Sequence, residues 1–219
     1  WYTLYDVTSL GFVKENFDAI VGGIVEGILE ADSKLQDGRL KVNAGRLLDS
    51  NINRSPTAYL ENPEEERKIY EEDGDTEKTM TVLRFEDANG QGLGVISWFS
   101  VHCTSMNNTN QLISGDNKGY ASYVFEKHMN PEALPGQNSF IAAFGQTNEG
   151  DVSPNTRGPK CPNGKSCDLL HSTCDGHVKN CIAFGPGRDM FESTQIIGMN
   201  QFKKALELFN SAQTEVEGP

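Results

Sequence analysis

The chain has 219 residues, 37% of them hydrophobic, and its 31 acidic and 19 basic residues give a formal net charge of −12. This length and apolar content suffice for a buried core, and the negative charge argues against nucleic acid and anionic lipid headgroups as partners. No run of 18 apolar residues is present, so the sequence predicts no membrane-spanning helix.

The first predicted elements are a helix and a short strand. Residues 16–31 place apolar side chains three and four positions apart, which is the spacing of a helix with one buried face. Residues 39–43 alternate between polar and apolar side chains and predict a strand. The charged stretch 62–78 is expected to be a solvated surface segment with about one helical turn after Pro63.

A β-hairpin is the clearest prediction in the middle of the chain. Residues 79–85 and 93–102 read as strands, and the turn between them carries Asn89 and Gly90. The second strand is apolar on both faces, so we expect it to be central in a sheet that is covered on both sides.

The rest of the chain alternates helices with a strand. "SGDN" can cap a helix predicted from about residue 118 to 129, residues 139–144 read as a buried strand, and residues 189–212 read as a long helix. The residues expected to face inward on the two helices are Ala121, Val124, Phe125 and His128, then Ile197, Ala205, Leu206 and Phe209. This interleaving predicts an α/β fold, with a layered mixed sheet and packed helices, in a single domain over residues 1–219.

Four of the five cysteines, at positions 161, 167, 174 and 181, lie close together, and none forms the C-x2-C pair of zinc ribbons. Disulfides are therefore favoured over a metal site, with three pairings open, and Cys103 is left over. The sequons at Asn53 and Asn107 agree with a location outside the cytoplasm.

His102 and Ser153 are the first candidate site residues, because each follows an apolar strand and sites gather where strands end in loops. An imidazole there suits metal binding or proton transfer, although a bond to a backbone carbonyl is the simpler interpretation. Ser153, in "GDVSPN", is more typical of a turn than of a nucleophile. Arg54, in "NINRSP", could bind a carbonyl or an oxyanion, or form a surface ion pair.

Four longer sequence motifs favour functional roles for these residues over the simpler structural ones. They are "NINRSP", "GVISWFSVHCTSMNNTNQLISGDNKGYAS", "AAFGQTNEGDVSPN" and "GPGRDMFESTQIIG". In this order and spacing they resemble the neutral ceramidase family over nearly the whole chain. The resemblance implies a zinc-dependent amidase that cleaves the N-acyl bond of ceramide to give sphingosine and a fatty acid.

The resemblance also implies roles for single residues. His102 corresponds to a zinc ligand, Ser153 to the catalytic serine and Arg54 to the arginine that contacts the substrate amide. The clustered cysteines match a family disulfide loop that pairs Cys161 with Cys174 and Cys167 with Cys181. Whether Ser153 attacks the amide, or only positions the substrate and a zinc-bound water, stays open.

The family's other zinc ligands, a further histidine, a glutamate and a tyrosine, match nothing in this sequence. We therefore expect an internal part of a ceramidase catalytic domain that holds one Zn²⁺ ligand and needs the remaining segments of that domain. The expected location is secreted or on the extracellular face of the plasma membrane, with peripheral membrane contact left open. The rival interpretations are a non-catalytic lipid-binding or structural fragment and a serine hydrolase without metal.

Overall fold

The computed structural model describes residues 11–217, which form two compact units that divide between Asp37 and Gly38. The first unit contains helix α2 (Lys14–Ser33), which confirms the helix predicted over residues 16–31. No residue of α2 is buried, and Phe17 and Ile28 of its apolar stripe are 52% and 64% exposed. The expected burial of this face is thus not observed, because apolar periodicity specifies a face that can be buried but not the surface that buries it.

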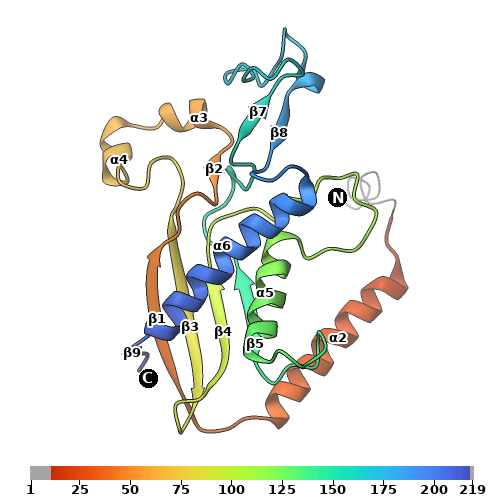
Figure 1. The fold of residues 1–219 in the computed structure, drawn as a ribbon, viewed down its shortest axis with the longest axis vertical. Helices are drawn as coiled ribbons and strands as arrows, with labels where there is room; N and C mark the ends of the chain where they lie inside the picture. The colour runs from red at the N-terminus through yellow and green to blue at the C-terminus, as the bar shows by residue number, and fades with distance from the viewer. Residues whose placement is uncertain (1–10, 218–219) are drawn as a thin grey trace. The chain divides into compact units, whose positions relative to one another are not determined.

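The second unit is built on a five-stranded mixed sheet with the strand order β5-β4-β3-β1-β9 (Figure 1). Strands β1, β3, β4 and β9 pair antiparallel, and β5 runs parallel to β4. The structure confirms the predicted hairpin and lengthens the strand predicted over residues 39–43. The strands are β1 (Gly38–Arg46), β3 (Thr79–Asp87), β4 (Gly92–Trp98), β5 (Ile141–Gly145) and β9 (Thr214–Glu215).

Two helices, α5 (Asp116–Met129) and α6 (Met190–Ser211), pack together on one face of this sheet (Figure 1). Helix α5 forms the crossover between the parallel strands β4 and β5, as such a connection requires. The Asp189 side chain caps α6 by accepting a hydrogen bond from the Glu192 amide at 2.8 Å. Both helices agree with the sequence prediction.

The core lies between these helices and the sheet. The Phe125 ring is central to it, because it stacks on Phe140 at 5.4 Å between centroids and meets Phe202 and Phe209 edge to face. Of the residues predicted to face inward, Ala121, Phe125, Ile197, Ala205 and Phe209 are buried, and Val124 and Leu206 are partly buried against them.

Strand β4 differs from the prediction in length and in coverage. It ends at Trp98, and the apolar residues that follow, Phe99 and Val101, are buried without being part of a strand. Coverage on both sides was expected, but only the face of Val95 lies under the helices, and Ile96 on the opposite face is half-buried. The long apolar run combined one strand with a buried loop, which a pattern of hydrophobicity alone does not separate.

Short elements connect the sheet to the loops beyond it. A two-stranded sheet pairs β2 (Ile52–Asn53) with β6 (Val152–Ser153), and helices α3 (Pro56–Leu60) and α4 (Glu64–Ile69) follow β2. Helix α4 is the helical turn expected after Pro63. No helix among residues 11–217 is both long and apolar enough to cross a bilayer.

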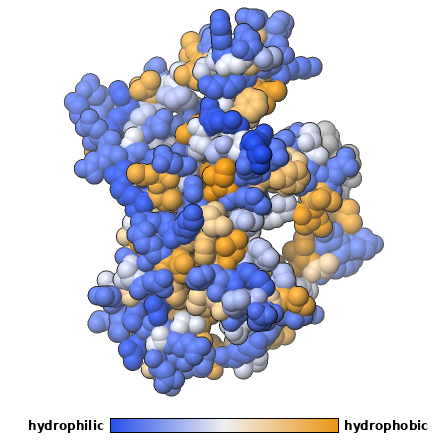
Figure 2. Space-filling view, in the orientation of Figure 1, coloured by the Kyte–Doolittle hydropathy of each residue, from blue (hydrophilic) through white to orange (hydrophobic). Residues whose placement is uncertain are grey.

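The cysteine-rich segment forms a separate hairpin of β7 (Gly158–Lys160) and β8 (Ile182–Phe184), with the 3-10 helix η1 (Val178–Asn180) before β8. Disulfides join Cys161 to Cys174 and Cys167 to Cys181, the crossed pattern that the family resemblance implied. The surface in this region is mainly hydrophilic (Figure 2). The covalent links therefore hold a segment that has little apolar core of its own.

Candidate functional site

The loop of residues 148–153 brings the three predicted site residues into one place. In the β2–β6 pair Ile52 lies opposite Ser153, so that Arg54 follows directly beside this loop. The Arg54 amide donates to Asp151 O at 2.8 Å, and its guanidinium donates to Gly150 O at 3.0 Å. The His102 amide donates to Val152 O at 3.1 Å. Short strand pairing thus gathers residues that are up to 99 positions apart in the sequence.

Ser153 is buried at the end of this loop, with 8% of its surface exposed. Its Oγ accepts a hydrogen bond from the Asn155 amide at 3.1 Å, which is the contact of a serine turn. The same amide can stabilise negative charge on that oxygen, so the turn does not exclude a catalytic role. Among the described residues, no hydrogen bond joins the Ser153 and His102 side chains.

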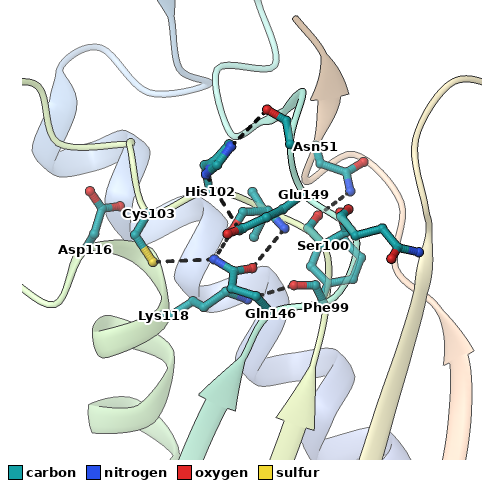
Figure 3. A network of polar contacts seen from close by, with 12 residues as sticks. Asn51, Phe99, Ser100, His102, Cys103, Asp116, Lys118, Gln146 and Glu149 are labelled. Carbon is teal, nitrogen blue, oxygen red and sulfur yellow. Dashed lines mark hydrogen bonds and ion pairs between the residues drawn. The ribbon is translucent and has the colours of Figure 1, made fainter. Parts of the chain in front are cut away.

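The imidazole of His102 lies against the loop through both ring nitrogens (Figure 3). Its Nδ1 is 3.6 Å from Glu149 Oε2, and its Nε2 is 3.4 Å from Gly150 O. Both distances are longer than those of ordinary hydrogen bonds, so these two contacts orient the imidazole ring only weakly. Glu149 Oε2 is itself buried without a hydrogen-bond partner.

These contacts bear on a metal site. A buried carboxylate oxygen without a partner, close to one nitrogen of an imidazole, resembles the arrangement that orients histidine ligands on zinc. His102 therefore fits a single zinc ligand. Within residues 11–217, the one cluster of three or more ligand-type side chains is that of Cys161, Cys167 and Cys174, and disulfides occupy these.

Arg54 is exposed and forms no ion pair within 4.0 Å among the described residues. The nearby carboxylate of Asp151 instead accepts a hydrogen bond from Asn53 Nδ2 at 2.7 Å. The surface ion pair weighed from the sequence is therefore not formed, and the guanidinium keeps donors free for a ligand.

Two side-chain amides, of the buried Asn51 and the half-buried Gln146, hold the segment that carries His102. Asn51 donates to Ser100 O at 2.6 Å, and Gln146 donates to Val101 O at 2.7 Å. The Ser100 hydroxyl donates to Asn148 O, which ties this segment to the loop of residues 148–153. Gln146 also reaches Cys103 Sγ at 3.9 Å, and this unpaired cysteine is exposed (Figure 3).

Lys118 adds a buried positive charge beneath the site. Its Nζ donates to Phe99 O at 2.9 Å and to Gln201 Oε1 at 3.1 Å. Burial removes water from the ammonium group and lowers the pKa of Lys118 to about 8. The charge is tolerated because both hydrogen bonds end on oxygen atoms.

Two open pockets border this region. One, of about 420 Å³, includes Tyr59, Asp75, Glu149 and Asp151. The other, of about 380 Å³, lies beside Asn155 and includes apolar side chains, with Phe184, Met190 and Phe191 among them. Both pockets combine polar and apolar lining, and the second includes Arg157 and Arg188 beside its apolar side chains.

Sequence reasoning missed Glu149, Asn51 and Gln146, and it read the Asp116–Asn117 pair only as a helix cap. In the structure the Asp116 carboxylate accepts from the amides of Ser105 and Met106 instead. The one available signal was that polar residues cluster around two apolar strands, and this pattern does not identify partners. His128, which was expected to face inward, is exposed, and its ring meets Phe202 edge to face at 5.7 Å.

Comparison with known proteins identifies similar sequences and structures. A family described as neutral/alkaline non-lysosomal ceramidase, N-terminal, matches residues 1–219. The chain is 61% identical over 220 residues to neutral ceramidase A of Dictyostelium discoideum and 48% identical over 215 residues to neutral ceramidase of Drosophila melanogaster. These alignments cover 99% and 98% of this chain, and 30% of each relative.

The fold is also similar to solved structures. The crystal structure of neutral ceramidase from Pseudomonas aeruginosa superposes with a TM-score of 0.76 at 40% sequence identity, and a ceramidase complexed with C2 superposes with a TM-score of 0.79 at 41% identity. All of this chain is covered in both comparisons, against 30% and 29% of the other chains. The chain therefore spans about 30% of the length of these relatives.

Proposed function

This chain belongs to the neutral/alkaline non-lysosomal ceramidase family, and on that basis we propose that it forms part of an enzyme that hydrolyses ceramide. The reaction cleaves the N-acyl amide bond and releases sphingosine and a free fatty acid. The observation that carries the proposal is the convergence of Arg54, His102 and Ser153 on the loop of residues 148–153. These are the residues that the family resemblance pairs with substrate binding, zinc binding and catalysis.

Ser153 is proposed as the nucleophile. Its oxygen attacks the amide carbonyl carbon, an ester forms on the serine, the C–N bond breaks and the leaving amine gains a proton. Water then hydrolyses the ester and regenerates the hydroxyl. The hydrogen bond from the Asn155 amide would stabilise the alkoxide as the serine loses its proton. The alternative is that Ser153 only positions the substrate while a water molecule attacks.

Arg54 is proposed to hold the amide of the substrate. Its guanidinium is anchored at one end on Gly150 O and offers further donors from a fixed position. These donors suit the carbonyl oxygen of ceramide, which becomes more negative in the transition state. The pocket beside Asn155, with Phe184 and Met190, is proposed to receive an aliphatic chain of the lipid.

His102 is proposed as one ligand of a zinc ion, with the other ligands supplied from outside this chain. A bound zinc ion polarises a carbonyl and lowers the pKa of water to about 7. His102 would contribute one imidazole nitrogen, and the ring is positioned by the backbone bond to Val152 and by the nearby Glu149 carboxylate.

The remaining segments of the same catalytic domain are the proposed partners, with residues 1–219 as one part of that domain. The half-buried face of the sheet around Ile96 and the exposed stripe of α2 both leave apolar surface for such packing. The two disulfides are compatible with a secreted protein, and we propose secretion or display on the outer face of the plasma membrane. Peripheral membrane contact would give access to ceramide.

The test is ceramide hydrolysis by the intact protein, with Ser153→Ala and His102→Ala variants. We expect both variants to lose at least a hundredfold in kcat. Ser166→Ala and His177→Ala, which change exposed residues of the disulfide hairpin, are the matched controls and should keep full activity. Unchanged hydrolysis in both site variants would refute the proposal.

Two further measurements separate the rival interpretations. A radiolabelled acyl group that accumulates on the Ser153 peptide would identify the serine as nucleophile, and its absence in single turnover would favour attack by water. Activity that survives strong chelators would favour a serine hydrolase without metal. A non-catalytic lipid-binding or structural role would leave every variant without measurable hydrolysis.

A further inference from the structure

A second group of buried polar side chains holds the His102 segment from the side of the helices. Asn117, at the start of α5, is fully buried. Its Nδ2 donates to His102 O at 3.0 Å and to Ser105 Oγ at 3.0 Å. One amide group therefore holds both the backbone carbonyl of His102, the candidate zinc ligand, and the side chain of Ser105.

Gln201 of α6 holds this asparagine in place. It is fully buried, and its Nε2 donates to Asn117 Oδ1 at 2.9 Å. Its Oε1 accepts from Lys118 Nζ, which in turn donates to Phe99 O. Gln201 thus fixes which way the Asn117 amide faces, because Asn117 Oδ1 must accept and its Nδ2 must donate.

Hydrogen bonds from α5 hold both ends of the segment of residues 99–102. Lys118 holds the carbonyl of Phe99, and Asn117 holds that of His102, so consecutive helical residues bind carbonyls three positions apart. A buried donor that satisfies a buried carbonyl resists loosening, since opening leaves both groups without partners. The direction of the His102 side chain follows from the backbone that these bonds hold.

We propose that Asn117, oriented by Gln201, is a positioning residue that presets His102 for metal binding. The inference rests on the proposed function for the identity of the metal. Asn117 is fully buried, so it acts through its hydrogen bonds to His102 O and Ser105 Oγ and not on the substrate. Its removal should therefore affect metal affinity and kcat, while binding of ceramide through Arg54 is preserved.

The test compares Asn117→Asp with Asn43→Asp in the intact protein. Asn43 is a matched control, because its Nδ2 also donates to a backbone carbonyl and a serine hydroxyl, those of Leu208 and Ser211, both at 3.0 Å. Zinc affinity is measured by competition with a chelator. Asn117→Asp should weaken it by about ten- to a hundredfold, in the range seen for changes behind metal ligands. The same variant should lower kcat with KM unchanged, whereas Asn43→Asp changes neither.

Gln201→Met provides a second variant if Asn117→Asp does not fold. This variant keeps the Asn117 amide but removes the hydrogen bond that orients it. Zinc affinity should therefore fall, but by less than in Asn117→Asp. Equal zinc affinity in Asn117→Asp and Asn43→Asp, or a change of less than twofold in both Asn117→Asp and Gln201→Met, would overturn the inference.

Hydrogen exchange separates this inference from the proposed function. Amides of residues 99–106 should exchange faster in Asn117→Asp than in Asn43→Asp, whether or not the protein binds zinc or hydrolyses ceramide. Unchanged exchange in this segment would remove the positioning role even if the enzyme proved to be a ceramidase. Faster exchange in a protein without zinc or activity would keep the positioning of His102 and refute the proposed function.

Discussion

Two loop regions of this molecule are held by different physical means. Residues 99–106 follow β4, and buried Asn51, Asn117 and Lys118 hold three of their carbonyl groups. Residues 161–181 are mostly exposed, and two disulfides hold them. The first region depends on the folded core, whereas the second carries its constraint within its own covalent structure.

The two regions should therefore respond differently to substitution. Hydrogen bonds to buried carbonyls are strong only while water is excluded, so a single substitution in the first region should affect the whole fold. Disulfides act mainly by restricting the unfolded chain, so their loss should loosen the hairpin and leave the sheet intact. Four changes test this contrast.

The largest expected effect is that of Asn51→Ala. Asn51 is 2% exposed and donates to the carbonyls of Glu77 and Ser100, and both would lose their partner. We expect the free energy of unfolding, measured with urea, to fall by about 4 kcal/mol. Asn163→Ala in the disulfide region is the control and should cost less than about 1 kcal/mol. Equal costs at both positions would contradict the contrast.

The second change replaces Cys167 and Cys181 by serine. We expect the free energy of local opening in residues 161–181 to fall by about 3 kcal/mol, the size typical of loops this long. Hydrogen exchange followed by mass spectrometry should show the change there and not in residues 99–106. A parallel increase in both regions would mean that the hairpin supports the buried segment.

The third change, Lys118→Met, tests the buried charge through pH. The pKa of Lys118 in the folded protein is about 8, below its ordinary value, so between pH 8 and 10 the unfolded chain binds more protons and stability rises with pH. We expect this rise to be about 2 kcal/mol between pH 7 and 10. It should disappear in Lys118→Met and persist in the control Lys179→Met, which changes an exposed residue. Identical pH profiles in all three proteins would show that Lys118 does not titrate in this range.

The smallest expected effect belongs to Asp189→Ala, which removes the cap of α6. The loss of one hydrogen bond to the Glu192 amide should cost about 1 kcal/mol in urea unfolding. Because α6 carries Gln201, the same cost should be seen in the exchange of residues 99–106. Lys165→Ala, which changes an exposed residue of the disulfide hairpin, is the control. A larger loss of unfolding free energy in Lys165→Ala than in Asp189→Ala would contradict the contrast between the two regions.

Much of the fold could be predicted from the sequence because its signals are local. Asn89 and Gly90 marked the hairpin, the apolar spacing in residues 189–212 marked α6, and the cluster of cysteines marked the disulfide region. In each case the residues that determine the structure lie within a few positions of each other.

The site was predictable only in part. Ser153, Arg54 and His102 were named, but residue type and spacing alone favoured simpler roles, and the resemblance supplied the functional ones. The supporting contacts, such as that of Gln201 with Asn117, join residues 84 positions apart. Buried amides leave no periodic pattern in the sequence, so their partners emerge only when the helices are packed.

The order of the strands also determines how the edges of the sheet behave toward other molecules. At one edge, β9 covers Lys41 and Val42 of β1, and the neighbouring Arg39 and Arg46 add charge that discourages further pairing. At the other edge, β5 is only five residues long and exposes Ile141. Self-association of this sheet through added strands should therefore begin at β5, and a lysine in place of Ile141 is the natural way to prevent it.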